Sequence, residues 1–443
     1  MNNIISRYVY QFVSSKNDYL IYCSLTNSFL KLTLELYDFL LQCRENSNLI
    51  AELDDELLSL FIKHKIIVSA GEDDNYLMRR EFYENQATYS SAALSLVLVP
   101  TAACNFDCHY CFETNKGGGA MSDETIDNLI AFAKKHEYSK EMNLTWYGGE
   151  PLLAFDTIKK ILPRLKAEID SPLKWHSIVT NGYYFSDEVI EFFKEYPLNN
   201  IQITLDGNRQ RHDSIRKQKH TGEGSFERII SNCEKILKDL PKTHLSIRVN
   251  IEKSNKNDFY ALQEELSKKW AGKNVSIYPG ILRIDNEDGT ALACNAIDVD
   301  EANEFDFEIS KKQSPERSLY PISVLTSACT ATCINSYIIG SRGEIYKCWN
   351  DVGDPKRIVG NIAEENLSNP RLLFRYVVST KWYHNEECKK CFYLPVCSGQ
   401  CAWYVLRNKY ENGKYNVCQC MQKTPDMLNK CLEEYYYNKN VVV

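Results

Sequence analysis

Three cysteines lie close together in the first quarter of the chain, at Cys104, Cys108 and Cys111, in the spacing C-x3-C-x2-C. Three thiolates on one loop can hold a [4Fe–4S] cluster and leave its fourth iron open to a small molecule. Zinc sites more often pair their ligands as C-x2-C or H-x3-H, and one loop would struggle to turn His109 inward together with all three cysteines. The spacing therefore favours one-electron redox chemistry, with zinc as the alternative.

The residues around these cysteines predict how the loop is positioned. An apolar run at residues 94–99 (LSLVLV) precedes the cysteine loop and predicts a buried strand. The next strand-like run, residues 142–147 (MNLTWY), leads directly into Gly148-Gly149-Glu150-Pro151. Adjacent glycines permit close backbone approach, and a glutamate offers an acceptor for an ammonium group. By itself, this motif predicts only a turn.

Together, the cysteine loop and the Gly-Gly-Glu-Pro motif resemble the radical S-adenosylmethionine (radical SAM) superfamily. The resemblance implies that the three cysteines bind a [4Fe–4S] cluster whose open iron chelates S-adenosylmethionine. It also implies that the segment Gly148, Gly149 and Glu150 meets the amino group of this cofactor, and that Tyr110 packs near its adenine. The segment at residues 212–216 (HDSIR) resembles a stretch of the same family and assigns Arg216 to the cofactor's carboxylate.

Strand-like and helical patterns alternate through this region. Further strand-like runs lie at residues 178–180, 201–205, 245–251 and 275–278, with helical patterns at residues such as 188–194 and 226–240. The alternation predicts an α/β fold with a parallel sheet, and six strands suit a partial (β/α)6 TIM-like barrel over residues 94–300. Four polar residues are expected at the carboxyl ends of strands, as cofactor contacts or ordinary turn residues: Asn181, Thr204, Asp206 and Asn250.

A second cysteine-rich region, residues 329–420, closely resembles the SPASM domain, which carries two auxiliary [4Fe–4S] clusters. The expected domain covers residues 301–443, and the expected cofactors are three [4Fe–4S] clusters and S-adenosylmethionine. The resemblance assigns one auxiliary cluster to Cys329, Cys333, Cys348 and Cys401, and the other to Cys388, Cys391, Cys397 and either Cys418 or Cys420. A zinc ribbon over residues 388–401 is the structural alternative.

The first 72 residues predict a separate small unit. Strand-like segments at residues 8–13 and 19–24 precede an amphipathic helix around residues 34–41, although the alternating leucines at its start could also form a strand. A second helix is expected at residues 54–65, followed by a strand at 66–69. This order resembles a winged-helix unit of the kind that recognises leader peptides by adding them to a sheet edge. A structural extension that covers the barrel is the alternative. Residues 73–93 are expected to form a linker or connecting helix with a solvated charged face.

The composition and charge of the chain limit which other classes of protein it can belong to. The chain has 443 residues, 44% of them hydrophobic, a net charge of −7 and 17 cysteines. The negative charge speaks against nonspecific nucleic-acid binding, and we expect no membrane span. Cysteine usage with no signal-peptide pattern predicts a cytoplasmic protein with metal centres.

The preferred function is a radical SAM oxidoreductase that installs a cross-link in a ribosomally made precursor peptide, with an electron donor such as flavodoxin or ferredoxin. Sulfatase-maturing enzymes are the main alternative, but they begin near the first cysteine motif and carry an aspartate directly after the cysteine equivalent to Cys348. Here that residue is Trp349, and Asp351 is a weak candidate for the base. A zinc-bound peptide-binding adaptor is the third possibility.

Overall fold

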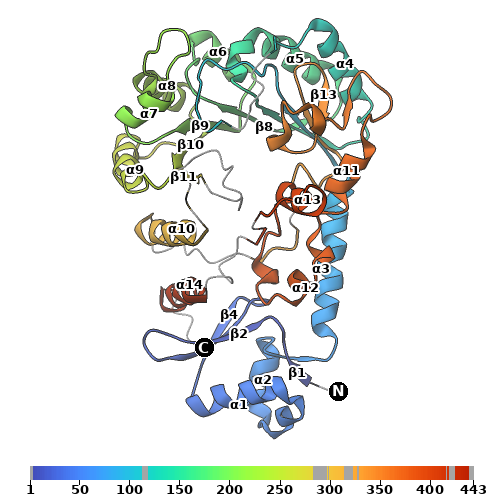
Figure 1. Cartoon of the computed structure of the whole chain (residues 1–443), viewed down its shortest axis with the longest axis vertical. Coiled ribbons are helices and arrows are strands. Elements are labelled where there is room, and N and C mark those ends of the chain that lie inside the picture. Colours follow the sequence, from blue (N-terminus) through green and yellow to red (C-terminus); the bar gives the residue numbers. More distant parts are fainter. Residues whose placement is uncertain are drawn as a thin grey trace.

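The structure is a computed structural model, and it describes residues 3–111, 118–282, 297, 299–313, 323–326, 329–415, 417–418 and 425–438. A large sheet with its covering helices lies at one end of the long axis, and the N-terminal unit lies at the other (Figure 1). The C-terminal segment lies between them. The chain therefore reaches the sheet only after it has built a unit at the far end.

Six parallel strands run side by side in chain order and form most of the sheet. They are β6 (Ala93–Leu98), β7 (Glu141–Trp146), β8 (Leu173–Thr180), β9 (Asn200–Leu205), β10 (His244–Ile251) and β11 (Val275–Ile281). Helices connect them: α4 (Asp123–Lys134), α5 (Phe155–Glu168), α6 (Asp187–Glu195), α7 (Arg209–Ile215), α8 (Phe226–Asp239) and α9 (Asp258–Lys269). This confirms the predicted α/β fold with a mostly parallel sheet.

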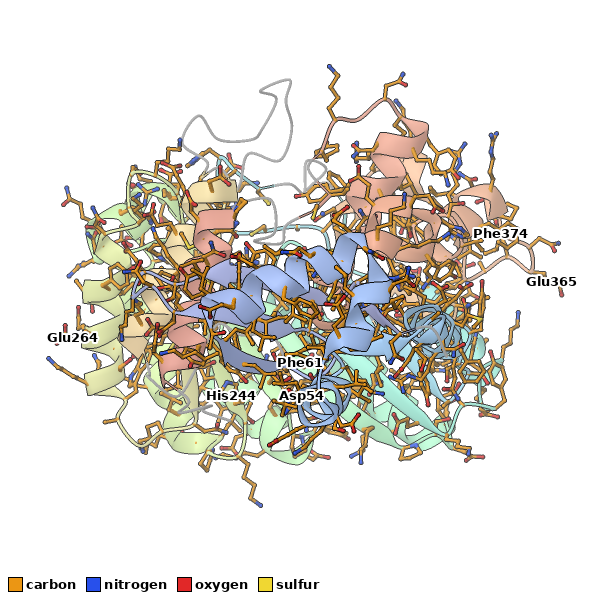
Figure 2. The ribbon with its side chains drawn as sticks, turned by 90° about the horizontal axis from the view of Figure 1, so that it is seen from below. Asp54, Phe61, His244, Glu264, Glu365 and Phe374 are labelled. Atoms are coloured by element: carbon orange, nitrogen blue, oxygen red, sulfur yellow. The ribbon has the colours of Figure 1, made fainter. Side chains whose placement is uncertain are left out.

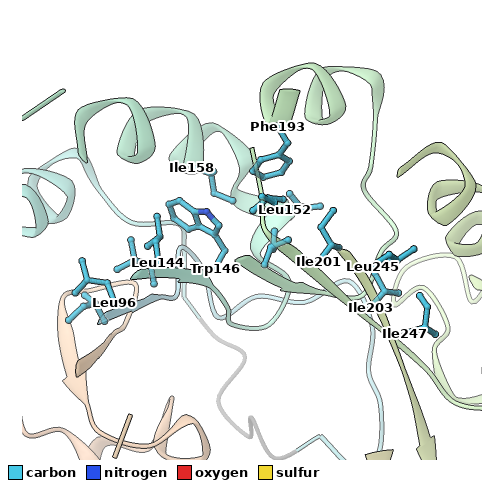
Figure 3. Packing of buried hydrophobic residues seen from close by; sticks show 14 of the residues in the cluster. Leu96, Leu144, Trp146, Leu152, Ile158, Phe193, Ile201, Ile203, Leu245 and Ile247 are labelled. Carbon is cyan, nitrogen blue, oxygen red and sulfur yellow. The ribbon is translucent and has the colours of Figure 1, made fainter. Parts of the chain in front are cut away.

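The two faces of the sheet differ because successive strand residues point to opposite sides. One face carries apolar side chains such as Trp146, Ile203 and Ile247, which pack against the helices as one buried cluster (Figure 3). On the other face polar side chains bond across the strands: Thr145 to Ser177 at 2.9 Å, and Ser246 to Asn200 at 2.7 Å. The sheet therefore presents a polar surface opposite its helix-covered face.

The C-terminal segment extends this sheet. Strand β12 (Ser336–Ile339) pairs in parallel with β6, and β13 (Glu344–Tyr346) and β14 (Gly360–Asn361) continue in antiparallel fashion. The resulting order is β11-β10-β9-β8-β7-β6-β12-β13-β14. The strand that precedes the first cysteine motif is thus an interior strand of nine.

The N-terminal unit contains two small antiparallel sheets. Strands β2 (Val9–Val13), β3 (Tyr19–Cys23) and β4 (Ser28–Leu32) form one, and β1 (Asn3–Ile5) pairs with β5 (Ile67–Ser69) to form the other. Helices α1 (Leu34–Glu45) and α2 (Asp55–Lys63) lie between β4 and β5. Thr33 caps α1, which explains why the alternating leucines of β4 end where the helix begins.

Both faces of the β2–β3–β4 sheet are covered. Ile21 and Leu30 pack with Leu40 of α1 on one face, and Leu20 packs with Leu432 of α14 (Pro425–Asn438) on the other. Viewed from below, the unit lies in front of the sheet, with the buried Phe61 of α2 near its centre (Figure 2). The N-terminal sheet and the C-terminal helix α14 therefore share one hydrophobic core.

Helix α3 (Glu72–Thr88) runs from the N-terminal unit towards the large sheet, along the side of the molecule (Figure 1). It corrects the expectation of a solvated charged face, because Asp73, Arg80 and Glu84 are each at most 2% exposed. Glu84 pairs with the buried Lys381 at 3.2 Å, and Asp73 accepts hydrogen bonds from the Ser6 hydroxyl and the Arg7 amide. Three of its charged side chains are therefore buried contacts, while Asp74, Arg79 and Glu81 are exposed.

The remaining helices lie in the C-terminal half: α10 (Val299–Gln313), α11 (Pro370–Val377), α12 (Glu386–Lys390) and α13 (Ala402–Tyr410). Phe374 of α11 is 57% exposed and lies at the margin of the view in Figure 2. Among the helices that the structure describes, none has the length and apolar character that crossing a bilayer requires.

Candidate active site

A cavity of about 450 Å³ opens at the carboxyl ends of the central strands and on the polar face of the sheet. All three cysteines of the first motif line it, together with Tyr110 between them. The opposite walls come from the ends of β7 to β10 and from the segment after Cys348. His109 is exposed and does not line the cavity. The loop thus directs its thiols, and not its imidazole, towards one space.

The two glycines after β7 allow the cysteine loop to lie against that strand end. A Cβ on Gly149 would come within 2.4 Å of the carbonyl oxygens of Ala102 and Ala103, and one on Gly148 within 2.5 Å of the Thr101 oxygen. Gly148 also has a φ of +122°. The amide of Glu150 then donates to the Ala103 carbonyl at 2.9 Å. A larger residue at either glycine would push the cysteine loop away.

Glu150 is a positioning residue in this arrangement. Its carboxylate is fully buried behind the cavity wall, where it accepts hydrogen bonds from the Leu152 amide (3.0 Å), the Thr180 hydroxyl (2.8 Å) and the Asn181 amide (2.7 Å). Complete burial raises the pKa of Glu150 to about 7, although these donors oppose the shift. This placement corrects the expectation that the carboxylate itself faces the cofactor's amino group. Gly148 and Gly149 do line the cavity.

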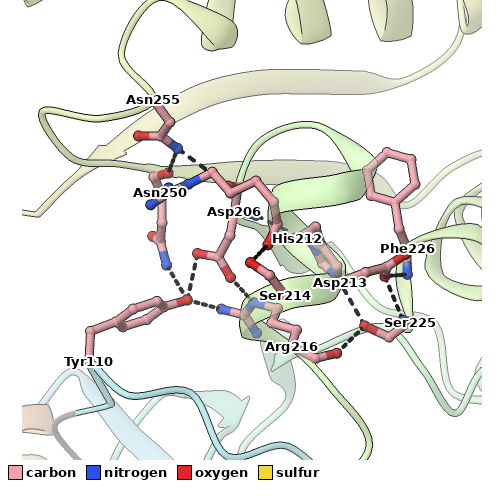
Figure 4. Close-up of polar contacts among 11 residues, drawn as sticks. Tyr110, Asp206, His212, Asp213, Ser214, Arg216, Ser225, Phe226, Asn250 and Asn255 are labelled. Atoms are coloured by element: carbon pink, nitrogen blue, oxygen red, sulfur yellow. Dashed lines mark hydrogen bonds and ion pairs between the residues drawn. The ribbon is translucent and has the colours of Figure 1, made fainter. Parts of the chain in front are cut away.

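Tyr110 joins the cysteine loop to the ends of two strands (Figure 4). Its hydroxyl donates to Asp206 Oδ1 at 2.5 Å, and accepts from Arg216 Nη2 at 2.8 Å and from Asn250 Nδ2 at 3.0 Å. Arg216 Nε also donates to Asp206 Oδ2 at 2.5 Å. Tyr110 itself lines the cavity, whereas Asp206 does not. Asp206 therefore positions Tyr110 and Arg216 from outside the cavity.

The segment around α7 fixes Arg216. His212 accepts the Asp206 amide on Nδ1 and donates from Nε2 to Ser225, whose hydroxyl bonds the Arg216 carbonyl at 2.7 Å. Asp213 accepts the amides of Ser225 and Phe226 at the start of α8 (Figure 4). Arg216 Nη1 makes no hydrogen bond within the described residues, and the side chain lines the cavity. Arg216 can therefore donate hydrogen bonds from Nη1 to a carboxylate in the cavity.

Charges in this network stabilise one another. Burial alone would raise the pKa of Asp206, but Arg216 and Tyr110 hold it below its ordinary value. Burial raises the pKa of Tyr110 well above 10, so the hydroxyl stays protonated and can donate. Burial lowers the pKa of His212 to about 4, and Arg216 adds to that effect. A neutral imidazole accepts on one ring nitrogen and donates from the other, which matches the two hydrogen bonds of His212.

Ten of the twelve residues predicted for the first cluster and its cofactor line this cavity; Glu150 and Asp206 do not. Asn181, Thr204, Arg216 and Asn250 line it with the cysteines, Tyr110 and the two glycines. Sequence reasoning missed eight others: Tyr147, Val179, Thr180, Gln202, Arg248, Leu282, Trp349 and Asn350. Strand periodicity could have found Gln202 and Arg248, because each lies two residues before a predicted site residue and so shares its face of the sheet.

Eight cysteines of the C-terminal region form two groups. Burial raises the pKa of the Cys348 thiol, and nearby Cys401 and Cys329 add to the rise; Cys333 interacts with Cys329 in the same way. Burial likewise raises the pKa of Cys388 to about 12, with contributions from Cys397, Cys391 and Cys418. The cysteines of each group therefore lie near one another, and their assignment to two auxiliary clusters stays a prediction. Cys420 lies outside the described residues.

Charged side chains hold each of the two groups in place. Lys347 is fully buried and donates to the carbonyls of Cys333 (2.6 Å) and Ser336. Arg80 of α3 donates to the carbonyls of Leu394 and Cys397, the latter at 2.6 Å. The N-terminal helix α3 therefore positions the second group.

Asp351 does not face the cavity, which corrects its role as a candidate base. Its carboxylate is fully buried and accepts hydrogen bonds from the Tyr376 hydroxyl (2.7 Å) and Trp403 Nε1 (3.1 Å). Trp349 and Asn350 line the cavity in its place. Trp349 packs edge-on against Tyr147 with ring centroids 4.5 Å apart. At this wall, the C-terminal segment offers an aromatic ring and an amide.

The donor set fits an iron–sulfur cluster. In the described part of the chain, no group of three or more His, Cys, Asp or Glu side chains is arranged around a point for a single metal ion. The ligands of a [4Fe–4S] cluster need no such point, since each thiolate binds a different iron. Three thiols beside a cavity leave space for a ligand on the fourth iron.

Comparison with known proteins places this site in a family. The profile of the radical SAM superfamily matches residues 98–266. A serine-type anaerobic sulfatase-maturating enzyme of Bacteroides thetaiotaomicron is 26% identical over 68% of this chain and 80% of that protein. The radical SAM cyclopropyl synthase TigE of Paramaledivibacter caminithermalis is 22% identical over 93% of this chain and 92% of its own.

The fold is also similar to a solved structure. Streptococcus suis SuiB bound to its precursor peptide SuiA aligns with a TM-score of 0.51 and 16% identity, over 94% of this chain and 99% of that one. Residues 98–266 are thus a radical SAM domain, and the chain is an enzyme. This confirms the resemblance predicted from the cysteine and glycine motifs, and it disfavours a zinc-bound adaptor.

Proposed function

We propose that this radical SAM enzyme modifies a ribosomally made precursor peptide by removing a hydrogen atom from it and installing a cross-link. The observation that carries the proposal is the meeting of three thiols, a carboxylate-binding arginine and a polar strand face in one cavity. When bound, the cluster and S-adenosylmethionine supply a one-electron cleavage that gives methionine and a 5′-deoxyadenosyl radical.

The chain's own residues bind and orient the reactants. Cys104, Cys108 and Cys111 would hold the cluster, and the backbone of Gly148 and Gly149 would lie against the cofactor's amino group. Arg216 Nη1 would bind its carboxylate, while Asp206 and Tyr110 keep the guanidinium in position. Asn250 Oδ1, which is buried and has no partner among the described residues, would accept a cofactor hydroxyl. Holding the reacting carbon against one hydrogen is the protein's main contribution.

The C-terminal cysteines would hold two auxiliary [4Fe–4S] clusters. Cys329, Cys333, Cys348 and Cys401 form one proposed ligand set, and Cys388, Cys391, Cys397 and Cys418 form the other. The electrostatic coupling within each set supports this division. Such clusters can accept an electron from the substrate or bind a substrate thiol. The first cluster would receive its electron from a flavodoxin or ferredoxin.

The N-terminal unit would bind the leader of the precursor peptide, as a winged-helix-like recognition element. Both faces of its β2–β3–β4 sheet are covered by α1 and α14, so an extended peptide would have to add at an edge strand. The two edge strands are β2 and β4. Arg44 donates to the Val9 carbonyl of β2 at 3.1 Å and so occupies part of the β2 edge. We therefore favour β4 as the edge that binds the leader.

Conversion of a sulfatase residue to formylglycine is the second candidate, and the relatives support it equally well. One observation weighs against it. The residue after Cys348 is Trp349, and the nearest aspartate, Asp351, is buried behind Tyr376 and Trp403. Among the described residues that line the cavity, none has a carboxylate or an imidazole that could act as a base.

Reconstituted protein tests the proposal. The enzyme should be brown, with about 12 irons per chain, four for each of three clusters. Incubation with S-adenosylmethionine, dithionite and a small peptide encoded beside its gene should release 5′-deoxyadenosine and remove about 2 Da from the peptide per cross-link. A parallel incubation with a sulfatase-derived peptide is the comparison. Formylglycine in that peptide, with no change in the first, would favour the second candidate.

A further inference from the structure

A second arginine lines the same cavity and has no acidic partner among the described residues. Arg248 lies on β10, two residues before Asn250, and points to the polar face of the sheet beside Thr204 of β9. Its Nε is buried and makes no hydrogen bond within the described part of the chain. Arg216, by contrast, is neutralised by Asp206 at 2.5 Å. Leaving a half-buried guanidinium without an anion is costly unless a ligand supplies one.

The neighbouring strand makes room for this side chain. A Cβ on Gly280 of β11 would come within 2.1 Å of Arg248 Nε and 2.8 Å of its Cγ. The arginine therefore lies flat across a position where every other residue type would block it. Gly280 has no left-handed φ, so close approach is its structural reason. The guanidinium lies over Gly280 and lines the cavity.

Gln202 adds a second donor on the same wall. The Tyr278 hydroxyl donates to Gln202 Oε1 at 2.9 Å, which leaves the amide NH2 to face away from Tyr278. Gln202 and Arg248 both line the cavity, from adjacent strands β9 and β10. With its oxygen engaged, the glutamine presents hydrogen-bond donors. This part of the wall thus combines a positive charge with neutral donors, the arrangement that a carboxylate requires.

We propose that Arg248 and Gln202 form a carboxylate-binding subsite that receives an acidic side chain of the peptide substrate. The inference rests on the proposed function and adds a substrate class to it: a peptide with aspartate or glutamate near the modified residue. S-adenosylmethionine has a single carboxylate, and Arg216 is already positioned to bind it. The second arginine is then left for the substrate.

Two capped tripeptides test the subsite without requiring turnover. Ac-Gly-Glu-Gly-NH2 and Ac-Gly-Gln-Gly-NH2 are titrated into reconstituted enzyme that is saturated with S-adenosylmethionine, under anaerobic calorimetry. The glutamate peptide should bind at least tenfold more tightly. The Arg248→Gln variant should reduce this preference below twofold, and Gly280→Ala should reduce it in part because the new methyl displaces the guanidinium. Arg248→Lys should retain several-fold preference.

A matched variant distinguishes the subsite from a general effect of charge. Arg79→Gln removes an equal charge from an exposed site on α3 and should leave the tenfold preference intact. Iron content shows whether each variant has folded. Equal binding of the two peptides by the wild-type enzyme, or a preference that survives Arg248→Gln, would overturn the proposal.

The affinity for S-adenosylmethionine identifies the source of the carboxylate. Arg248→Gln should change it by less than twofold. A tenfold loss, together with no peptide preference in the wild type, would assign the subsite to the cofactor and refute a peptide contact. Because binding is measured and not turnover, a peptide that binds but is never modified would count against the proposed reaction while leaving the subsite in place.

Discussion

The hydroxyl of Tyr110 donates a 2.5 Å hydrogen bond to the carboxylate of Asp206, 96 residues further along the chain. This contact ties the cysteine loop to the end of β9, and Arg216 and Asn250 bond the same hydroxyl. The position of the loop therefore depends on buried polar contacts as well as on the strand that precedes it. Such networks are sensitive to the loss of one member.

Replacing Asp206 with asparagine should be strongly destabilising. It leaves Arg216, whose side chain is 10% exposed, without its counter-charge, which typically costs about 3–5 kcal/mol. The melting temperature should fall, and the affinity for S-adenosylmethionine should weaken at least tenfold. Glu227→Gln is the matched control, because Glu227 pairs with Arg209 on the surface and such pairs contribute about 0–1 kcal/mol. Equal effects of the two changes would contradict the assigned network.

Replacing Gly149 with alanine should displace the cysteine loop. The added methyl would lie 2.4 Å from two carbonyl oxygens of that loop, and backbone cannot move aside cheaply. We expect purified protein with about four fewer irons and no cleavage of S-adenosylmethionine. Gly119→Ala is the control, since no atom lies within 4 Å of its Cβ position and its φ is not left-handed. Full iron content in the Gly149 variant would refute the close-approach argument.

The cysteines of the two regions should separate in function. Cys104→Ala should abolish release of 5′-deoxyadenosine, because the first cluster loses a ligand. Cys391→Ala should allow that cleavage and impair mainly peptide modification or solubility. Cys43→Ala removes a buried thiol from the N-terminal unit and should leave both activities and the iron content unchanged. Cleavage that persists unchanged in Cys104→Ala would remove the basis for the assigned cluster.

Two buried histidines should make the protein sensitive to acid. Burial lowers the pKa of His176 and of His212 to about 4 each, from 6.5 in an unfolded chain. The unfolded state then binds more protons between pH 6.5 and 4, so stability is complete above pH 6.5 and falls as the pH decreases, by up to about 1.4 kcal/mol per unit for each group. Nitrogen-15 NMR of labelled histidines should show two midpoints near pH 4. Midpoints near 6.5 would contradict the neutral state of the two imidazoles, in which His176 Nε2 accepts from Trp146 Nε1 at 2.8 Å and His212 Nδ1 accepts from the Asp206 amide.

Local patterns predicted the large sheet well. The six predicted runs between residues 94 and 278 became parallel strands in chain order, since apolar runs between helices leave few other arrangements. The predicted cavity residues were those at strand ends or on the cysteine loop. Arg248 and Gln202 lie two residues earlier on their strands, so only the alternation of the strand faces, counted back from Asn250 and Thr204, would have identified them.

Contacts between distant segments were not predictable from periodicity. The charges of α3 suggested a solvated face, yet Arg80 and Glu84 are buried because the partners they meet come from residues 381–397. Likewise, Asp351 and Glu150 each carry a carboxylate in a suggestive motif. Apart from the nearby Leu152 amide, their hydrogen-bond donors come from residues 25 or more positions away, so only the folded chain shows that these groups position other residues.

The pairing of β12 with β6 has a consequence for dissecting the enzyme. A fragment ending near residue 300 would leave one side of β6 with bare amide and carbonyl groups along an apolar strand. Such an exposed edge templates association with other chains. Expression of the catalytic region alone should therefore give aggregates, and any shortened version should keep residues 336–339 to cap that edge.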